Sequence, residues 1–169
     1  RGTYPFVHNV DHLGPLADSV EGLALSYDAM QSPDALDAGC HALSVQPIAA
    51  DLRKGTDGLR IGLLGGYFAD NATAPAQLVA RQAASALRAI DGVDWPEPAL
   101  ARAAAFITSA SEGGALHLAD LRTRADEFEP LLVDRFISGA LQPAAWYVRA
   151  QRFRRHYREK VNALFRHWD

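Results

Sequence analysis

The C-terminal segment 143–169 carries an apolar stripe that an α-helix would gather on one side. The stripe consists of residues spaced by three or four positions: Trp146, Ala150, Phe153, Tyr157, Val161, Leu164 and Trp168. In a helix with 3.6 residues per turn this spacing places all of them on one face. Pro143 suits the first turn of such a helix. The sequence therefore predicts a helix from Pro143 to the end of the segment.

The rest of this predicted helix is strongly basic. Segment 143–169 has seven basic residues against two acidic ones, a local charge of +5, although the whole chain carries −3. The arginines form either a solvated face, whose stems cover apolar surface, or a surface that binds an acidic partner or RNA. Because the remainder of the chain is acidic, nucleic acid is not the favoured partner.

Other segments are predicted to alternate between loop, strand and helix. Residues 1–15 indicate irregular structure. Asp18, with Glu21 three residues later, predicts the N-terminal cap of a helix that reaches about Gln31. Residues 32–58 predict a long loop with at most a short strand. Residues 59–64 predict a buried strand, which Gly65 and Gly66 close.

Three further helices are expected before the last one. Thr73 and Pro75 begin the first of these, no helix is expected between the glycine pair and Pro75, and Asp91-Gly92 ends it. Its inner face is expected to consist of Leu78, Ala83, Ala86, Leu87 and Ile90. A brief strand is predicted over 93–95. The other two helices are predicted over 98–122, with Gly113-Gly114 as a weak point, and over 129–141.

Size and composition bound the class of protein. A chain of 169 residues with 49% apolar and 22% charged residues is long enough for one core, and we place no domain boundary in 1–169. Cys40 is the single cysteine, which favours a reducing cytoplasm. No apolar run approaches the roughly 18 residues that a membrane span needs. Because Met30 is the only methionine, we expect a piece of a longer or processed protein.

Residue patterns by themselves predict no catalytic centre. The chain has no G-x-S-x-G motif around a serine. His8 and His12 are four residues apart, but Pro5, Gly14 and Pro15 oppose the helix that would align them. No metal site and no cofactor are therefore expected. Composition and spacing alone predict a mostly helical α/β chain of unspecified function.

Several short motifs nevertheless follow one another in a characteristic order. They are GTYPF at 2–6, VDHLGPLADSV at 10–20, LRIG at 59–62, SEG at 111–113, RFISGA at 135–140 and AWYVRAQR at 145–152. In this order they resemble the later part of the amidase signature family. GGYF at 65–68, taken with AQRFRR at 150–155, is similar to the carboxybiuret hydrolase-like subgroup.

The resemblance implies a partial amidase-signature α/β fold, a mixed sheet flanked by helices, with this segment mostly helical. It also implies hydrolysis of a C–N amide or ureido bond by a Ser–Ser–Lys triad. In the family, the triad residues lie upstream of the region that this sequence resembles. Lys54 and Lys160 are the only lysines here, and neither lies in a matching motif. No catalytic residue can therefore be assigned, and the segment alone is expected to be inactive.

Two residues are expected to contact substrate. His8 matches a position at which an arginine binds a carboxylate in relatives that act on allophanate. Arg135 matches an arginine that binds the substrate α-carboxylate in the related aminoacyl-tRNA amidotransferases, where its planar fork meets both oxygens. The alternative for Arg135 is a structural salt bridge to Asp134 or Asp126.

The leading hypothesis is therefore a part of an amidohydrolase that acts on a small, linear amide or ureido substrate. Such relatives imply an oligomer and a small accessory subunit. The alternative is a non-catalytic binding or scaffold module that uses the basic C-terminal helix to bind an acidic partner or RNA.

Overall fold

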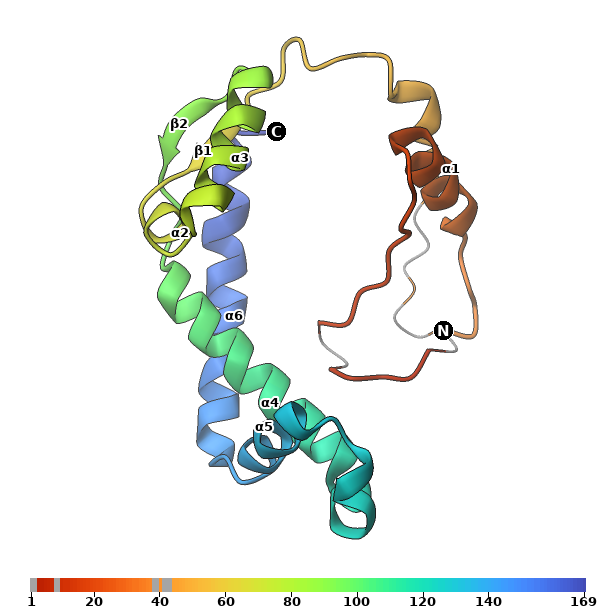
Figure 1. The fold of residues 1–169 in the computed structure, drawn as a ribbon, viewed down its shortest axis with the longest axis vertical. Coiled ribbons are helices and arrows are strands. Elements are labelled where there is room, and N and C mark those ends of the chain that lie inside the picture. The colour runs from red at the N-terminus through yellow and green to blue at the C-terminus, as the bar shows by residue number, and fades with distance from the viewer. Residues whose placement is uncertain (1–2, 8–9, 38–39, 41–43) are drawn as a thin grey trace. The chain divides into compact units, whose positions relative to one another are not determined.

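The computed structural model describes residues 3–7, 10–37, 40 and 44–169 (Figure 1). The chain divides into two compact units. The first comprises Arg1–Pro5 and Asp11–Asp57, and the second comprises Phe6–Val10 and Gly58–Asp169.

The first unit is built on helix α1, Val20–Met30. Its N-cap is Ser19, whose hydroxyl accepts the Gly22 N–H at 3.1 Å. The prediction of Asp18 as the cap was thus wrong by one residue, because the serine already satisfies a free amide of the first turn. The Asp28 carboxylate accepts the amides of Ile48 and Ala49 at 2.8 and 3.0 Å.

Those two bonds anchor a 3-10 turn over Ala49–Asp51 to α1. This turn is the single regular element in the described part of 32–58, so the short strand allowed there is not formed. The loop prediction is otherwise confirmed. Side-chain carboxylates that accept backbone amides are a common way to order such a segment.

The second unit contains a small parallel sheet. Strand β1, Gly62–Leu64, pairs with β2, Ile90–Val93, with Gly62 opposite Ile90 and Leu64 opposite Val93. The connection runs through α2, Tyr67–Asp70, and α3, Ala74–Ala86. Helix α2 corrects the expectation that no helix lies between Gly66 and Pro75. Its single turn directly follows the strand, and four residues are too few for a periodic pattern to reveal.

Helix α3 ends earlier than its sequence pattern indicates. Its last residue is Ala86, and Arg88 adopts a left-handed conformation with φ of 53°. A helix cannot continue through that conformation, so the prediction of an end at Asp91-Gly92 was wrong. Ile90 belongs to β2, and the strand predicted over 93–95 begins three residues sooner.

The three long helices are confirmed, except that the last one ends at Leu164 and does not reach residue 169. Helix α4 spans Pro98–Arg124, α5 spans Pro130–Ala140, and α6 spans Ala144–Leu164. Figure 1 shows α5 against the C-terminal half of α4, and α6 alongside α4. At the α4–α5 crossing, a Cβ on Gly139 would overlap the Ala110 carbonyl, and one on Gly114 would lie 2.5 Å from the Ala140 nitrogen. Gly113-Gly114 is therefore a packing site and leaves α4 unbroken.

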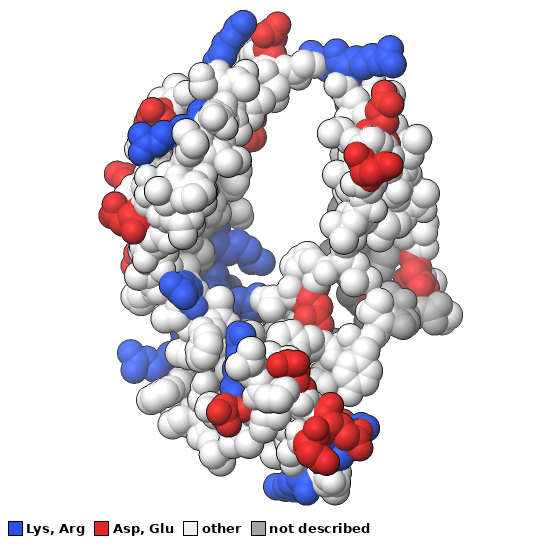
Figure 2. Space-filling view, viewed as in Figure 1, with Lys and Arg blue, Asp and Glu red and all other residues white. Residues whose placement is uncertain are grey.

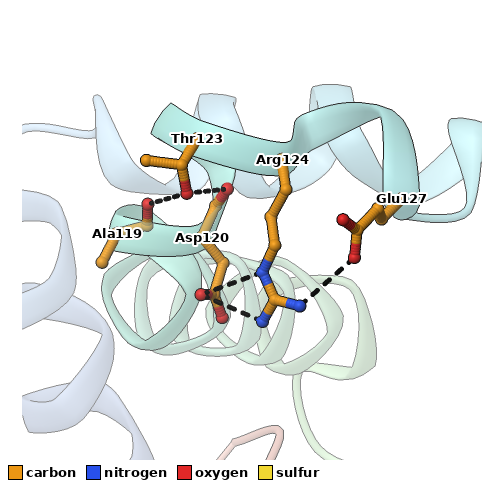
Figure 3. A network of polar contacts seen from close by, with 5 residues as sticks. All are labelled: Ala119, Asp120, Thr123, Arg124 and Glu127. Atoms are coloured by element: carbon orange, nitrogen blue, oxygen red, sulfur yellow. Dashed lines mark hydrogen bonds and ion pairs between the residues drawn. The ribbon is translucent and has the colours of Figure 1, made fainter.

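The C-terminal end of α4 is tied by Arg124 (Figure 3). Its guanidinium pairs with Asp120 at 3.1 Å and with Glu127 at 3.2 Å. Both acidic partners raise the pKa of Arg124. Because the groups are solvent-exposed, this network adds little stability.

Much apolar surface in the second unit has no cover. The expected inner face of α3 is open, with Leu78 at 58% exposure, and Ile90 in β2 is at 62%. On α6, Ala150 is buried, but Trp146 is 52% exposed. Among the described residues, no helix is both long enough and apolar enough to cross a membrane.

Candidate functional site

Arg135 lies on α5 and reaches across to α4. Its Nη2 donates to the Ser109 hydroxyl at 3.1 Å, and its guanidinium carbon lies 5.0 Å from the centre of the Phe106 ring. The Ser109 hydroxyl in turn donates to the Phe106 carbonyl at 3.2 Å. Ser109 and Phe106 lie three residues apart on α4, about one helical turn, so they share a face. The guanidinium is thus held by a hydroxyl and an aromatic ring.

The surroundings of Arg135 leave its positive charge without a carboxylate. Within the described ranges, neither Asp134 nor Asp126 forms an ion pair with it. Its Nε–H is buried and has no hydrogen-bond partner in that part of the chain. A buried donor without a partner is costly. Such a donor on a cation is chemically suited to an anion that completes its hydrogen bonds.

An aromatic cluster fixes α5 beside α4 next to this site. Phe136 packs against His117 and Phe6, with ring centres 5.0 and 5.7 Å apart. His117 is 6% exposed and is therefore a buried histidine. Val7 is fully buried. Phe6 is itself 37% exposed and contacts Phe136 from the edge of this cluster, whereas His8, the other predicted substrate contact, lies outside the described residues.

A second set of polar contacts, which no sequence pattern indicated, joins α4 to α6 and to the turn that precedes α6. Tyr147 donates to Glu112 at 2.8 Å, and the Ser111 hydroxyl donates to Gln142 at 3.0 Å. Burial, and then the hydrogen bond and charge of Glu112, raise the pKa of Tyr147. These pairs are 35 and 31 residues apart in the chain. Ser111 and Glu112 thus hold helices together here.

The remaining features support no catalytic centre of their own. Gly66 begins α2 with φ of 48°, and the Gly65 amide donates to the Val93 carbonyl, so the glycine pair forms a turn after β1. Over the described ranges, no three His, Cys, Asp or Glu side chains gather closely enough to hold a metal ion. The candidate group is therefore the guanidinium of Arg135, which contacts a hydroxyl and an aromatic ring.

Comparison with known proteins identifies the class to which this fold and site correspond. The family model for amidases matches residues 1–169. The chain therefore belongs to the amidase family, and the resemblance of its ordered motifs is confirmed.

Individual relatives narrow the comparison. The chain is 66% identical over 169 residues to AtzE, which is part of the 1-carboxybiuret hydrolase of Pseudomonas sp. (strain ADP), covering 100% of this chain and 37% of that one. It is 29% identical over 200 residues to the A chain of the glutamyl-tRNA(Gln) amidotransferase of Thermus thermophilus, covering 99% and 41%. The similarity to the carboxybiuret hydrolase-like subgroup is thereby confirmed.

A solved structure gives the same result for the fold. It comes from work on a vestigial protein complex and the origins of an s-triazine catabolic enzyme. It matches with a TM-score of 0.96 and 66% identity, over 100% of this chain and 37% of the other. The partial amidase-signature α/β fold is confirmed. The chain spans less than half the length of the relatives it matches.

Proposed function

We propose that this chain forms the carboxylate-binding side of an amidohydrolase active site. The substrate is a small, linear amide or ureido compound that carries a carboxylate, and Arg135 binds that group. The observation that carries the proposal is the half-buried guanidinium with neutral neighbours and an unpartnered Nε–H. The membership in the amidase family and the 66% identity to part of a carboxybiuret hydrolase support this substrate class.

The proposal assigns the Ser–Ser–Lys triad to polypeptide outside residues 1–169. In support, neither Lys54 nor Lys160 has the setting of a catalytic base. Lys54 pairs with Asp51 at 2.6 Å, and Lys160 pairs with Glu97 at 2.6 Å. Both ammonium groups are partly exposed and paired, whereas a lysine that takes up protons needs burial or a positive neighbour to lower its pKa. Residues 1–169 alone are expected to be inactive.

The same proposal makes the chain part of one larger amidase domain in a cytoplasmic oligomer with a small accessory subunit. The open apolar surface of α3 and β2 supports the first part, because a domain core would bury such residues. The names of two relatives, each given as one subunit of an enzyme, support the second.

Substitution of Arg135 in the full-length enzyme tests the carboxylate contact. Arg135→Leu removes charge-assisted hydrogen bonds, each contributing about 1.5–3 kcal/mol. We expect kcat/KM for a carboxylated ureido substrate to fall by about 10- to 150-fold. Arg135→Lys should restore only part of that loss, because an ammonium lacks the planar fork.

The matched control is Arg122→Leu, an arginine substitution on α4. It should leave kcat/KM unchanged, and the neutral amide analogue should not distinguish Arg135→Leu from wild type. An unchanged kcat/KM for the carboxylated substrate in Arg135→Leu would remove Arg135 from the site.

His8 is proposed as a second contact to the anion, through its protonated form. The test is the pH dependence of kcat/KM in the full-length enzyme. We expect His8→Asn to remove one inflection between about pH 6 and 7, near the ordinary histidine pKa. A profile that superimposes on that of wild type would exclude a titrating role for His8.

A further inference from the structure

The middle of α6 forms one wall of a groove of about 540 Å³ in the second unit. Arg154, Arg155 and Arg158 line it, together with Trp95, Gln151 and Tyr157. Figure 2 shows Lys and Arg side chains over this part of the α6 surface. Neither Arg135 nor its contacts on α4 line the groove, so it is separate from the proposed substrate contact.

Its polar lining consists of hydrogen-bond donors, and no Asp or Glu lines it among the described residues. The Tyr157 oxygen accepts the Trp95 indole N–H, so the tyrosine proton is left to donate outward. The Gln151 Oε1 atom already accepts from Arg154 at 3.0 Å. Lys160, beside this surface on α6, is neutralised by Glu97. The groove therefore favours a ligand that offers several anionic acceptors.

Spacing along the helix defines the ligand further. Arg155 and Arg158 are three residues apart, which is about 4.5 Å along a helix axis. Two carboxylates three residues apart on a partner helix have the same separation. Guanidinium groups pair with carboxylates through two parallel hydrogen bonds. Arg155 and Arg158 are exposed and therefore accessible to such a partner.

The aromatic residues of the groove favour a polypeptide over a nucleic acid. One face of the Tyr157 ring is covered by Phe153, which stacks on it at 5.3 Å and 21°. Trp95 makes edge-to-face contacts with Phe68 and Phe165, at 6.4 and 6.5 Å. These rings are engaged in internal packing, whereas single-stranded RNA needs free ring faces for its bases. The acidic remainder of the chain also repels an extended polyanion.

We propose that the groove lined by Arg154, Arg155 and Arg158 docks an acidic segment of a partner protein, with carboxylates about 4.5 Å apart binding Arg155 and Arg158. This inference does not depend on the proposed substrate or on Arg135. It predicts a partner segment with a pair of acidic residues on one helical face.

Fluorescence anisotropy with the full-length protein tests the proposal. The probe is a labelled helical peptide of about 12 residues with two glutamates three residues apart, and its counterpart has glutamines at those positions. We expect the glutamate peptide to bind about tenfold more tightly, and this preference to shrink as salt is raised from about 50 to about 300 mM.

Charge reversal locates the binding surface. The double variant Arg155→Glu/Arg158→Glu should lose the preference for the glutamate peptide. The matched control is Arg149→Glu/Arg152→Glu, which makes the same charge change on the same helix without touching the groove. The control should weaken binding by less than about threefold. Circular dichroism melts of both variants should match wild type.

Three outcomes would overturn the proposal. One is the absence of a preference for the glutamate peptide. Another is an equal loss in both double variants, which would indicate general charge attraction. The third is that a labelled polyuridine of similar length binds more tightly than the peptide and loses affinity only in the groove variant, which would assign the groove to RNA. An inactive Arg135→Leu enzyme would leave all of these readouts unchanged.

Discussion

The Asp169 carboxylate binds both the backbone and the side chain of Arg60, the residue that precedes β1 by two positions. The Asp169 carboxylate accepts from the Arg60 backbone N–H, Nε and Nη2 at 2.9, 3.0 and 2.8 Å, and the Asp169 amide donates to the Arg60 carbonyl. These bonds lower the pKa of Asp169 from 3.8 to about 2. Arg60 Nη1 also donates to the Arg166 carbonyl at 2.9 Å, so Arg60 joins the start of the sheet to the segment that follows α6.

Arg60→Gln should return the pKa of Asp169 towards 3.8. Since the folded pKa is depressed, the ion pair contributes above about pH 4 and is lost as the pH falls towards about 2. Carboxyl chemical shifts in an NMR pH titration measure this directly. Arg53→Gln, which removes the longer 4.0 Å pair with Glu21, should leave the Asp169 titration where it is. An Asp169 pKa that stays near 2 in Arg60→Gln would show that other groups depress it.

Single residues also show the limit of prediction from sequence. Arg135 was found through a motif, but its contact with Ser109 spans 26 residues and depends on how two helices cross. Tyr147 and Glu112 raise the same difficulty at a separation of 35 residues. No local pattern encodes these distances, because packing sets them. The N-cap of α1 is a smaller error: Asp18 was predicted and Ser19 is found, and both residue types cap helices well.

At the scale of elements, the α4–α5 crossing has no room for a side chain at Gly139. Gly139→Ala should lower the free energy of unfolding by more than about 3 kcal/mol, because the methyl group meets the Ala110 carbonyl. This loss exceeds the roughly 1 kcal/mol that alanine gains in helix propensity. Urea unfolding of the full-length protein measures the change.

Gly14→Ala is the control, because a Cβ there has nothing within 4 Å. It should change the free energy of unfolding by less than about 1 kcal/mol. A Gly139→Ala protein as stable as wild type would mean that α5 can move away from α4 at little cost.

The Tyr147–Glu112 bond should couple α4 to α6. In a double-mutant cycle with Tyr147→Phe and Glu112→Gln, we expect a coupling free energy of about 1–2 kcal/mol, because a part-buried hydrogen bond to a carboxylate is lost. Denaturant unfolding of the four proteins measures it. Additive single effects would show that the bond does not stabilise this helix pair.

Elements themselves were predictable where periodicity is long. The helices over 98–124, 130–140 and 144–164 agree with their apolar spacing, which persists for many turns. The end of α3 was missed because Arg88 adopts positive φ without being a glycine, a conformation that residue type does not indicate. Short α2 was missed because one turn carries no period.

At the scale of the whole molecule, the described residues expose several large apolar side chains. Leu131 and Leu141 at 85% and 78% exposure add to the open residues of α3 and β2. We expect residues 1–169, expressed alone, to bind a hydrophobic dye such as ANS several-fold more strongly than the full-length protein does. Equal dye fluorescence per molecule would contradict the proposal that further polypeptide covers this surface.

The contact of Gly139 with Ala110 also fixes the position of α5 along α4. A shift of α5 by one residue, about 1.5 Å along its axis, would bring Ser138 or Ala140 against the same carbonyl. The two helices therefore have a single register, and the position of Arg135 relative to Ser109 is fixed. Sliding of α5 along its axis therefore cannot change the position of Arg135 relative to α4.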